Sequence, residues 1–388
     1  MKNKPTSIKS PPSGEELSNR LEKVKNLMNK QDLDYYISFD PVNIYYLTNF
    51  ANYVHERPFI LVIPKKGIPK ILAPLLEVSH VETRAKCELE IFSYFEYPAP
   101  KGENWFDKYR SLIEKDSKVG VESAMPLRIF DKTPGTKIKT DIIDEVRLIK
   151  TDYEIGRLVH ACEIVNLGHK KLLELSRPGE FFMKIYNEAR GQMMAQILFD
   201  IPHMNPIVTT AHALIFPPSR SHDPHNFTDL FFKLEEGGPH VSLTASQVDG
   251  YGVELERTLF LGTVPEKAIE PFNVVMEGRR LAYELAKPGA NMGEIDAAVR
   301  KVFKEKGYGD KLLHRTGHGI GITGHEAPYL ATGYDRKLEP NMLISIEPGI
   351  YIPGVGGFRH SDTVLITDDG NVRLTEAPDT LEGVTIQL

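Results

Sequence analysis

Three short segments in the second half of the chain carry the side chains best suited to chemistry. The first reads Gly-Tyr-Gly-Val-Glu-Leu-Glu-Arg-Thr over 250–258 and has carboxylates at Glu254 and Glu256. In a strand, residues two apart point to the same face, so these two carboxylates are expected to lie together. Like charges held together need solvent, a paired base or a bound cation. A solvated strand face beside Arg257 is the alternative that requires no function, and this segment alone leaves it open.

The second segment, 316–328, is a glycine-rich loop that carries two histidines, His318 and His325. Four of its glycines fall within the eight residues 317–324. Glycine lets a backbone approach a neighbour closely or adopt a positive φ. Two imidazoles on such a loop indicate a functional site more than a packed core.

The third segment, 345–363, has Glu347 between apolar residues at the end of a strand-like run, followed by Arg359. A lone buried carboxylate is costly, so Glu347 needs a partner. That partner is either a cation of the functional site or, in a purely structural alternative, Arg359.

Size and composition limit the setting in which these segments act. The chain has 388 residues, which is long for one domain and ordinary for two. Its 41% hydrophobic and 26% charged residues are typical of a soluble globular protein, and its net charge of −6 argues against nucleic-acid binding. Two cysteines, no signal-like start and no long apolar run indicate a cytoplasmic protein with no membrane partner.

The elements that must position these segments form two predicted domains. After a disordered tail over 1–15, alternating helical and strand-like patterns over 16–145 predict a compact α/β domain. Residues 146–388 form the second predicted domain, and a capping box of Thr151 and Glu154 predicts the start of its first helix.

A weak internal repeat organises the second domain. Leu-Ser-Arg-Pro-Gly at 175–179 matches Leu-Ala-Lys-Pro-Gly at 285–289, and each predicts helix, turn, helix. The repeat therefore indicates a duplicated unit of two helices and a sheet. The stretch 199–240, which is rich in proline and holds five of the thirteen histidines, is expected to be irregular.

The three segments, in this order, resemble the signature of the pita-bread family of prolidase, aminopeptidase P, methionine aminopeptidase and creatinase. Asp-Pro-Val-Asn-Ile-Tyr-Tyr-Leu-Thr at 40–48 is similar to the motif of its amino-terminal domain, and 147–150 is similar to the opening of its catalytic domain. The resemblance covers nearly all of the chain after residue 15. It implies an α+β fold, with a pita-bread catalytic domain after a smaller α/β creatinase-type domain.

For the metallopeptidases, the resemblance implies two metal ions held by two aspartates, a histidine and two glutamates. Carried over in that order, these ligands fall on Leu243, Glu254, His318, Glu347 and Ser361. A leucine cannot bind a cation, and a serine hydroxyl poorly replaces the bridging carboxylate that a two-metal site needs. We therefore expect no cofactor. The alternative is one divalent ion, such as zinc, manganese or cobalt, on Glu254, His318 and Glu347.

Creatinase, a metal-independent member of the family, has the most similar site pattern, including Leu-Glu-Arg-Thr-Leu-Phe at 255–260. The resemblance implies that the catalytic histidine is His225, in a His-Asn pair, with His222 in reserve. It also implies that Arg57, two residues after His55, reaches the site of a neighbouring subunit. His325 stands where creatinase has a second arginine that grips its substrate, so we do not expect creatine to be the substrate.

These residues can be given chemical roles. Without a metal, a histidine near its ordinary pKa suits the transfer of a proton, and Arg57 suits a substrate carboxylate. We expect catalytic roles for His225, Glu256, Glu347 and His318. We expect substrate contacts from Arg57, His55, Glu254, His325, Tyr251 and Arg359.

The predicted function is therefore a hydrolase of this family, acting without metal as a cytoplasmic homodimer. It would cleave a carbon–nitrogen bond in a small guanidino, amidino or amide substrate that carries a carboxylate. Two alternatives remain open: a metallohydrolase like Xaa-Pro dipeptidase or aminopeptidase with a reduced metal site, and a non-catalytic protein that binds a partner. The polar residues retained at 256, 318, 325 and 347 argue against the last.

Overall fold

A computed structural model describes residues 4–53, 56–96, 98–226 and 229–388. They form two compact units, one over Ser10–Arg147 and one over Leu148–Leu388 together with the described residues up to Lys9. Along the described chain, no helix has the length and apolar character to cross a membrane. The mixed fold agrees with the α+β prediction.

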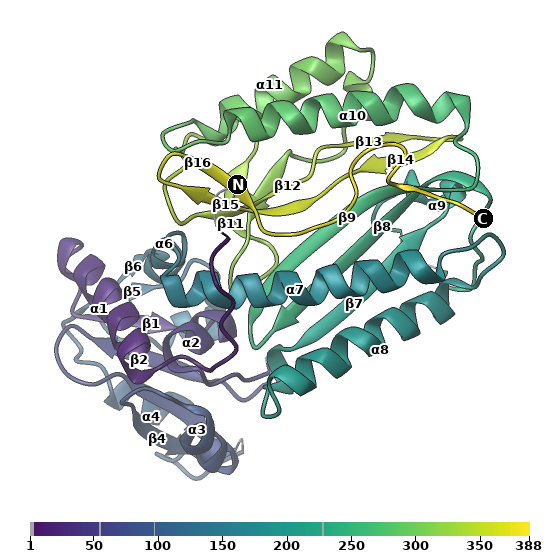
Figure 1. The fold of residues 1–388 in the computed structure, drawn as a ribbon. Helices are drawn as coiled ribbons and strands as arrows, with labels where there is room; N and C mark the ends of the chain where they lie inside the picture. Colours follow the sequence, from purple (N-terminus) through teal and green to yellow (C-terminus); the bar gives the residue numbers. More distant parts are fainter. Residues whose placement is uncertain (1–3, 54–55, 97, 227–228) are drawn as a thin grey trace. The chain divides into compact units, whose positions relative to one another are not determined.

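The unit Ser10–Arg147 is built on a six-stranded sheet in the order β4-β3-β2-β1-β5-β6 (Figure 1). Strand β1 pairs antiparallel with β2 and parallel with β5, so the sheet is mixed. Its elements are α1 (Gly14–Lys30), β1 (Tyr35–Ser38), α2 (Pro41–Thr48), β2 (Ile60–Pro64), β3 (Lys70–Pro74), η1 (Leu75–Glu77), α3 (Val78–Arg84), β4 (Glu90–Tyr94), α4 (Trp105–Ser111), β5 (Lys118–Val121), α5 (Leu127–Phe130), β6 (Thr136–Lys139) and α6 (Ile142–Arg147).

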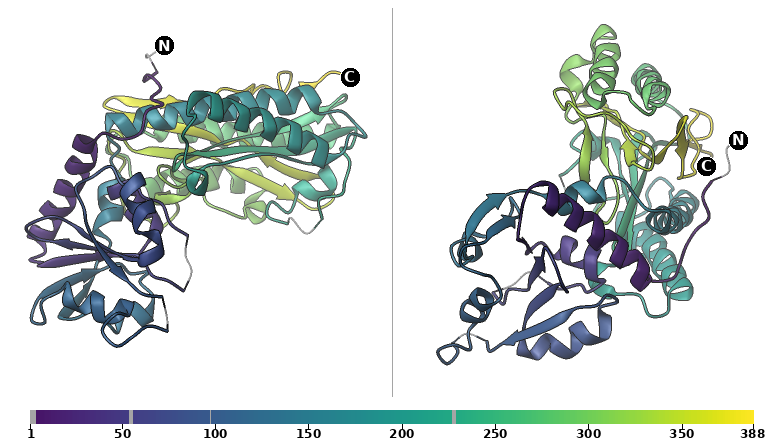
Figure 2. Two further views of the ribbon diagram at one scale, coloured as in Figure 1. Left: turned by 90° about the horizontal axis from the view of Figure 1, so that it is seen from below. Right: turned by 90° about the vertical axis from the view of Figure 1, so that its left-hand side faces the viewer.

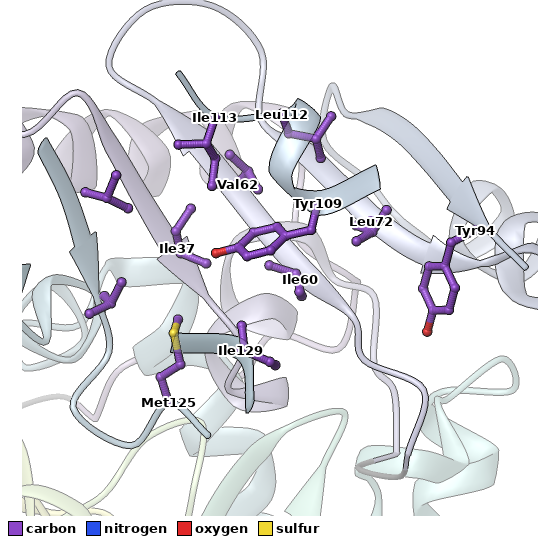
Figure 3. Packing of buried hydrophobic residues seen from close by; sticks show 12 residues of the cluster. Ile37, Ile60, Val62, Leu72, Tyr94, Tyr109, Leu112, Ile113, Met125 and Ile129 are labelled. Atoms are coloured by element: carbon purple, nitrogen blue, oxygen red, sulfur yellow. The ribbon is translucent and has the colours of Figure 1, made fainter. Parts of the chain in front are cut away.

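The core of this unit is a cluster of apolar side chains from the sheet and its helices. Figure 3 shows Tyr109 of α4 among Ile37, Val62 and Leu72 of three neighbouring strands. The Tyr109 hydroxyl is buried but shares a hydrogen bond of 2.8 Å with Thr133 Oγ1, so this polar group is satisfied.

The family-like motif at 40–48 becomes helix α2, and its first residues explain why the helix starts there. The Asp40 side chain accepts a hydrogen bond of 2.8 Å from the Val42 amide, and Pro41 occupies the first helical position. Buried Glu122 in turn accepts from the Asp40 amide at 2.9 Å. The motif therefore fixes a helix start against the sheet.

The unit Leu148–Leu388 contains two helix pairs and three sheets. The sheet orders are β17-β9-β8-β7, β11-β10-β12-β15-β16 and β13-β14. Its elements are α7 (Asp152–Leu175), α8 (Phe182–Asp200), η2 (Pro206–Val208), β7 (Thr210–Phe216), α9 (Pro218–Ser221), β8 (Gly237–Val248), β9 (Tyr251–Leu261), α10 (Glu266–Leu285), α11 (Met292–Glu305), η3 (Gly309–Lys311), β10 (Gly317–Gly319), β11 (Glu326–Leu330), β12 (Leu343–Ile346), β13 (Gly349–Ile352), β14 (Gly356–Arg359), β15 (Asp362–Thr367), β16 (Gly370–Arg373) and β17 (Thr385–Ile386).

The predicted repeat corresponds to the two helix pairs. Helices α7 and α10 end at the two matched positions, and Gly179 and Gly289 turn the chain with φ of 81° and 84°. The pair α7 and α8 lies along β7, β8 and β9, and α10 lies beside α11 (Figures 1 and 2). The predicted capping box of Thr151 and Glu154 is present at the start of α7.

Two expectations differ from the structure. The described part of the expected disordered tail is ordered, because Ser13 caps α1 and the Ile8 amide donates a hydrogen bond of 2.9 Å to Gly156 O on α7. The stretch 199–240 is not irregular throughout, since strand β7 lies within it and pairs along its whole length with β8. Because the stretch is rich in proline and histidine, we did not recognise the strand-like pattern of Thr-Ala-His-Ala-Leu-Ile-Phe at 210–216, in which every second residue is buried.

Candidate active site

Strand β9 presents two carboxylates to one face, as its alternation predicted. Glu254 and Glu256 are both buried, and Leu243 of β8 is the direct cross-strand partner of Glu256. Ser361 pairs with Glu256 on the other side through two backbone hydrogen bonds of 3.0 and 3.1 Å. The hydroxyl of Ser361 donates to Glu254 Oε1 at 2.8 Å.

His318 completes this group from strand β10. Its Nδ1 lies 3.0 Å from Gly319 O, so that nitrogen carries the proton and Nε2 faces the carboxylates. Nε2 lies 3.1 Å from Glu347 Oε1 and 3.5 Å from Glu254 Oε1, yet makes no well-formed hydrogen bond within the described residues. A buried nitrogen that lies between two acids without a well-formed hydrogen bond to either marks a place for a ligand.

The glycines beside His318 have a steric reason. A β-carbon at Gly317 would lie 2.1 Å from Ser345 O, and one at Gly319 would lie 2.2 Å from Ala327 O. Neighbouring strands therefore approach the backbone here so closely that side chains are excluded on both sides of His318.

The charges of this group favour a cation at its centre. Burial acts to lower the pKa of His318, but Glu254 and Glu347 outweigh it and raise the pKa to about 10. Burial acts to raise the pKa of Glu254, but His318 and His325 hold it well below its ordinary value. The acids therefore hold a positive charge where His318 meets them.

Arg359 pairs with Glu256, whereas the structural alternative paired it with Glu347. Its Nη2 donates to Glu256 Oε1 at 2.5 Å, and its Nε forms an ion pair with Oε2. Its Nη1 donates to the Tyr351 hydroxyl at 3.2 Å. Burial raises the pKa of Glu256 well above its ordinary value, Arg359 opposes this shift, and Glu254 adds to it.

Two further residues in this arrangement had no role in the sequence prediction. Tyr351 stood inside the third segment without an assignment, and the His314 ring lies 2.8 Å from its hydroxyl through Nε2. His314 Nδ1 in turn lies 2.8 Å from Arg315 O. His314 reaches Arg359 through the Tyr351 hydroxyl, and no spacing in the sequence predicts this link because it depends on how distant strands pair.

The predicted histidines differ in exposure. His325 stacks on His318, with ring centroids 3.7 Å apart, and its Nε2 lies 3.7 Å from Glu254 Oε2. Its side chain is 62% exposed, so it lies on the open side of the group. His225 is exposed and lines a pocket of about 230 Å³ that also contains Leu243 and Arg359. His222 lines a neighbouring hollow.

Of the other predicted substrate contacts, Tyr251 is the one that the structure places apart from this group. Tyr251 points to the opposite face of β9, where it packs against Tyr153 and under the Arg157 guanidinium. Arg57 belongs to the other unit and forms an ion pair with Glu96 there. His55 lies outside the described residues.

Comparison with known proteins places this geometry in a family. A model of metallopeptidase family M24 matches residues 156–368, and a model of the creatinase/prolidase N-terminal domain matches residues 20–149. The chain belongs to metallopeptidase family M24.

Its relatives in family M24 match over almost their whole length. The Xaa-Pro dipeptidase of Pyrococcus furiosus is 28% identical over 93% of this chain and 98% of its own. The solved prolidase of Pyrococcus horikoshii is 26% identical, with a TM-score of 0.78 over 93% of this chain and 99% of its own. The solved Xaa-Pro dipeptidase of Bacillus anthracis is 26% identical, with a TM-score of 0.79 over 95% of this chain and 99% of its own. The chain is therefore an enzyme, a hydrolase of carbon–nitrogen bonds, as the sequence indicated.

Membership of family M24 corrects two predictions. We expected no cofactor and a metal-independent, creatinase-like reaction, but the matching family is one of metallopeptidases and the relatives are Xaa-Pro dipeptidases. The structure also gathers donor atoms of Glu254, His318 and His325 within 4.8 Å of one another. The inference from missing ligands was wrong because it counted positions in the sequence and did not foresee the place of His325.

The donor set fits one divalent ion. Glu254 and His318 lie at its centre, Glu347 on the buried side and His325 on the open side. Two carboxylates and two imidazoles match the ligand types of zinc, manganese or cobalt. At the positions where the resemblance in the sequence implies two further carboxylates, the chain has Leu243 and Ser361, and neither side chain offers a carboxylate to a second ion.

Proposed function

We propose that this chain is a metal-dependent hydrolase of small peptides of the Xaa-Pro dipeptidase type. The observation that carries the proposal is the buried His318 Nε2 between Glu254 and Glu347, a donor set that calls for a cation. The Xaa-Pro dipeptidases and prolidases that match over almost the full length support the substrate class. The proposal makes a dipeptide with carboxy-terminal proline the substrate.

Each ligand would have a distinct task. Glu254, His318 and Glu347 would hold the ion, and His325 would approach it from the open side. Such an ion acts as a Lewis acid on the scissile carbonyl. The bond from His318 Nδ1 to Gly319 O keeps Nε2 turned toward Glu254 and Glu347, where it would bind the ion, and opposes rotation of the ring.

His225 is our candidate for the general acid and base. It is exposed at a pocket that also contains Arg359, so it can exchange protons with water and still face a bound substrate. Arg57 of a second copy would bind the substrate carboxylate with two hydrogen bonds, which makes a homodimer part of the proposal. We place the enzyme in the cytoplasm, because two cysteines in 388 residues suit a reducing compartment.

The test is an assay of the purified chain loaded with manganese, cobalt or zinc. We expect hydrolysis of Ala-Pro and Leu-Pro but not of Ala-Ala, complete loss with a chelator, and recovery when the metal is returned. A panel of guanidino and amidino acids serves as the contrast. Turnover of that panel in the presence of chelator, with no cleavage of Xaa-Pro dipeptides, would contradict the proposal.

His225 and His222 allow the proposed proton transfer to be tested with a variant and a matched control. His225→Ala should lower kcat for Leu-Pro by about 10²–10⁴-fold, the usual contribution of a general acid or base. His222→Ala should remain near wild type, and the metal content of both variants should be unchanged. Retained activity in His225→Ala would reject the role given to His225.

A further inference from the structure

We propose that the ion pair of Glu256 with Arg359 takes the place of a second metal ion, so that each chain binds one divalent ion. This inference rests on the proposed metal-dependent function and defines the composition of its site. Its starting point is the position of Glu256 in the sheet.

Glu256 lies between the two positions at which the family's carboxylates are replaced. Leu243 is its direct partner across β8, and Ser361 is its partner on the opposite side. The three residues therefore form one row across neighbouring strands. In this row the middle residue supplies a carboxylate, while the two flanking residues supply none.

The carboxylate of Glu256 is ion-paired with Arg359 through both of its oxygens. Oε1 accepts a hydrogen bond from Nη2, and Oε2 forms an ion pair with Nε that is not a well-formed hydrogen bond. A planar guanidinium paired in this way with a carboxylate is held in both position and orientation. Separating the pair would leave two buried charges without partners, which is strongly unfavourable. Glu256 is therefore unable to serve as a free ligand.

Tyr351 and His314 hold Arg359 from its other side. Because His314 Nδ1 donates to Arg315 O, its Nε2 is an acceptor in the neutral ring and receives the Tyr351 hydroxyl proton at 2.8 Å. The Tyr351 oxygen is then left as an acceptor for Arg359 Nη1. Nη1 and Nη2 of Arg359 therefore each donate to an acceptor, so the guanidinium is held from two sides.

The charges of the site then balance with one ion. Glu256 and Arg359 pair with each other and call for no further cation. Glu254 and Glu347, whose ion pairs are with histidines, would match one divalent cation bound in place of the proton of His318. A second divalent ion would find no free carboxylate, and the buried guanidinium of Arg359 would repel it.

The direct test is the metal content of the wild-type chain. Protein saturated with Mn²⁺, freed of excess by gel filtration and analysed by elemental mass spectrometry should contain about one ion per chain. Calorimetric titration with Mn²⁺ should give a single binding event. Two ions per chain together with Xaa-Pro hydrolysis would overturn this inference and leave the proposed function standing. No bound ion and no metal-dependent hydrolysis would overturn both.

A pair of variants tests the part played by Arg359. Glu256→Gln keeps the shape but leaves Arg359 uncompensated, so we expect Mn²⁺ to bind roughly 10–100-fold more weakly. Glu256→Gln combined with Arg359→Met removes both charges and should return the affinity to within about threefold of wild type. If the double variant binds as weakly as the single variant, Glu256 is itself a ligand and the inference is wrong. Should a variant fail to fold, the wild-type metal content still decides.

Discussion

Two buried groups of charged residues lie on opposite faces of strand β9. The site cluster consists of Glu254, Glu256, His318, Glu347 and Arg359. The core charge cluster consists of Arg257, Arg279 and Asp362, and all three are buried. Because neighbouring residues of a strand point in opposite directions, Glu256 and Arg257 belong to different clusters although they are adjacent in sequence.

The two clusters differ in how their central acidic or basic group is bonded, although each has a buried nitrogen without a well-formed hydrogen bond among the described residues, Arg279 Nε in the core charge cluster and His318 Nε2 in the site cluster. Arg257 donates to Asp362 Oδ1 at 2.9 Å and to Glu256 O, Ser361 O and Pro378 O at 2.6, 3.0 and 2.7 Å. Asp362 also accepts from Arg279 and from Thr375. In the site cluster, by contrast, His318 Nε2 lies 3.1 Å from Glu347 Oε1 and 3.5 Å from Glu254 Oε1. A buried acid bonded directly to two arginines supports the fold, whereas an imidazole nitrogen placed between two acids has capacity for a ligand.

Breaking the core charge cluster should cost the most stability. Asp362→Asn would remove the buried counter-charge that Arg257 and Arg279 share, and we expect the free energy of unfolding to fall by about 3–5 kcal/mol. Urea denaturation followed by circular dichroism measures the change. Asp310→Asn is the control, because Asp310 pairs with Lys311 at 2.7 Å on the surface, where its side chain is 71% exposed, and we expect almost no loss. Equal losses in the two variants would contradict the contrast.

Breaking the site cluster should act on metal binding. His318→Ala removes the central nitrogen donor, so we expect Mn²⁺ affinity to fall by more than about a hundredfold, beyond the usual effect of an outer-shell change. His240, which is equally buried but outside both clusters, provides the control as His240→Gln. Unchanged Mn²⁺ affinity in His318→Ala would remove the basis of the proposed metal site.

The sequence predicted the features of this molecule that depend on local rules. Alternation along a strand placed Glu254 and Glu256 on one face, and the capping box and paired Pro-Gly turns located the helices of the repeat. The same alternation applied to Tyr251 would have placed it on the opposite face, but we assigned it to the substrate. These features depend on residues close together in the chain, so a single sequence contains the information.

The remaining features depend on contacts between distant segments. Arg359 pairs with Glu256 more than a hundred positions earlier, and only the alignment of β9 with the start of β15 brings them together. The stacking of His325 on His318 depends on the path of a loop. Counting ligand positions therefore found Leu243 and Ser361 where carboxylates are expected, but it could not show that Arg359 pairs with Glu256 or that His325 stacks on His318.

Two buried histidines near the core charge cluster allow the two clusters to be compared through the pH dependence of stability. This is the smallest of the expected effects. His169 of α7 lies near Arg257, and burial together with that arginine lowers its pKa from 6.5 to about 3, although Asp362 opposes the shift. Nearby His360 is also buried, and its pKa is shifted in the same direction. His318, surrounded by carboxylates, is shifted upward. Burial acts to lower the pKa of all three histidines, and at His318 the carboxylates outweigh it and reverse the direction of the shift.

This difference predicts how stability depends on pH. Because the folded pKa of His169 lies below the unfolded one, its contribution is complete above pH 6.5 and is lost as the pH falls from 6.5 toward 3, where the unfolded chain alone binds the proton. At pH 5 the loss should be about 2 kcal/mol. His169→Leu should remove this part of the pH dependence, while His203→Leu, at an exposed position, should retain it. Urea denaturation of both variants at pH 7 and pH 5 measures it. If the free energy of unfolding falls by the same amount between pH 7 and pH 5 in both variants, His169 is already protonated in the folded chain. The core charge cluster would then be able to accept a further hydrogen bond, like the site cluster.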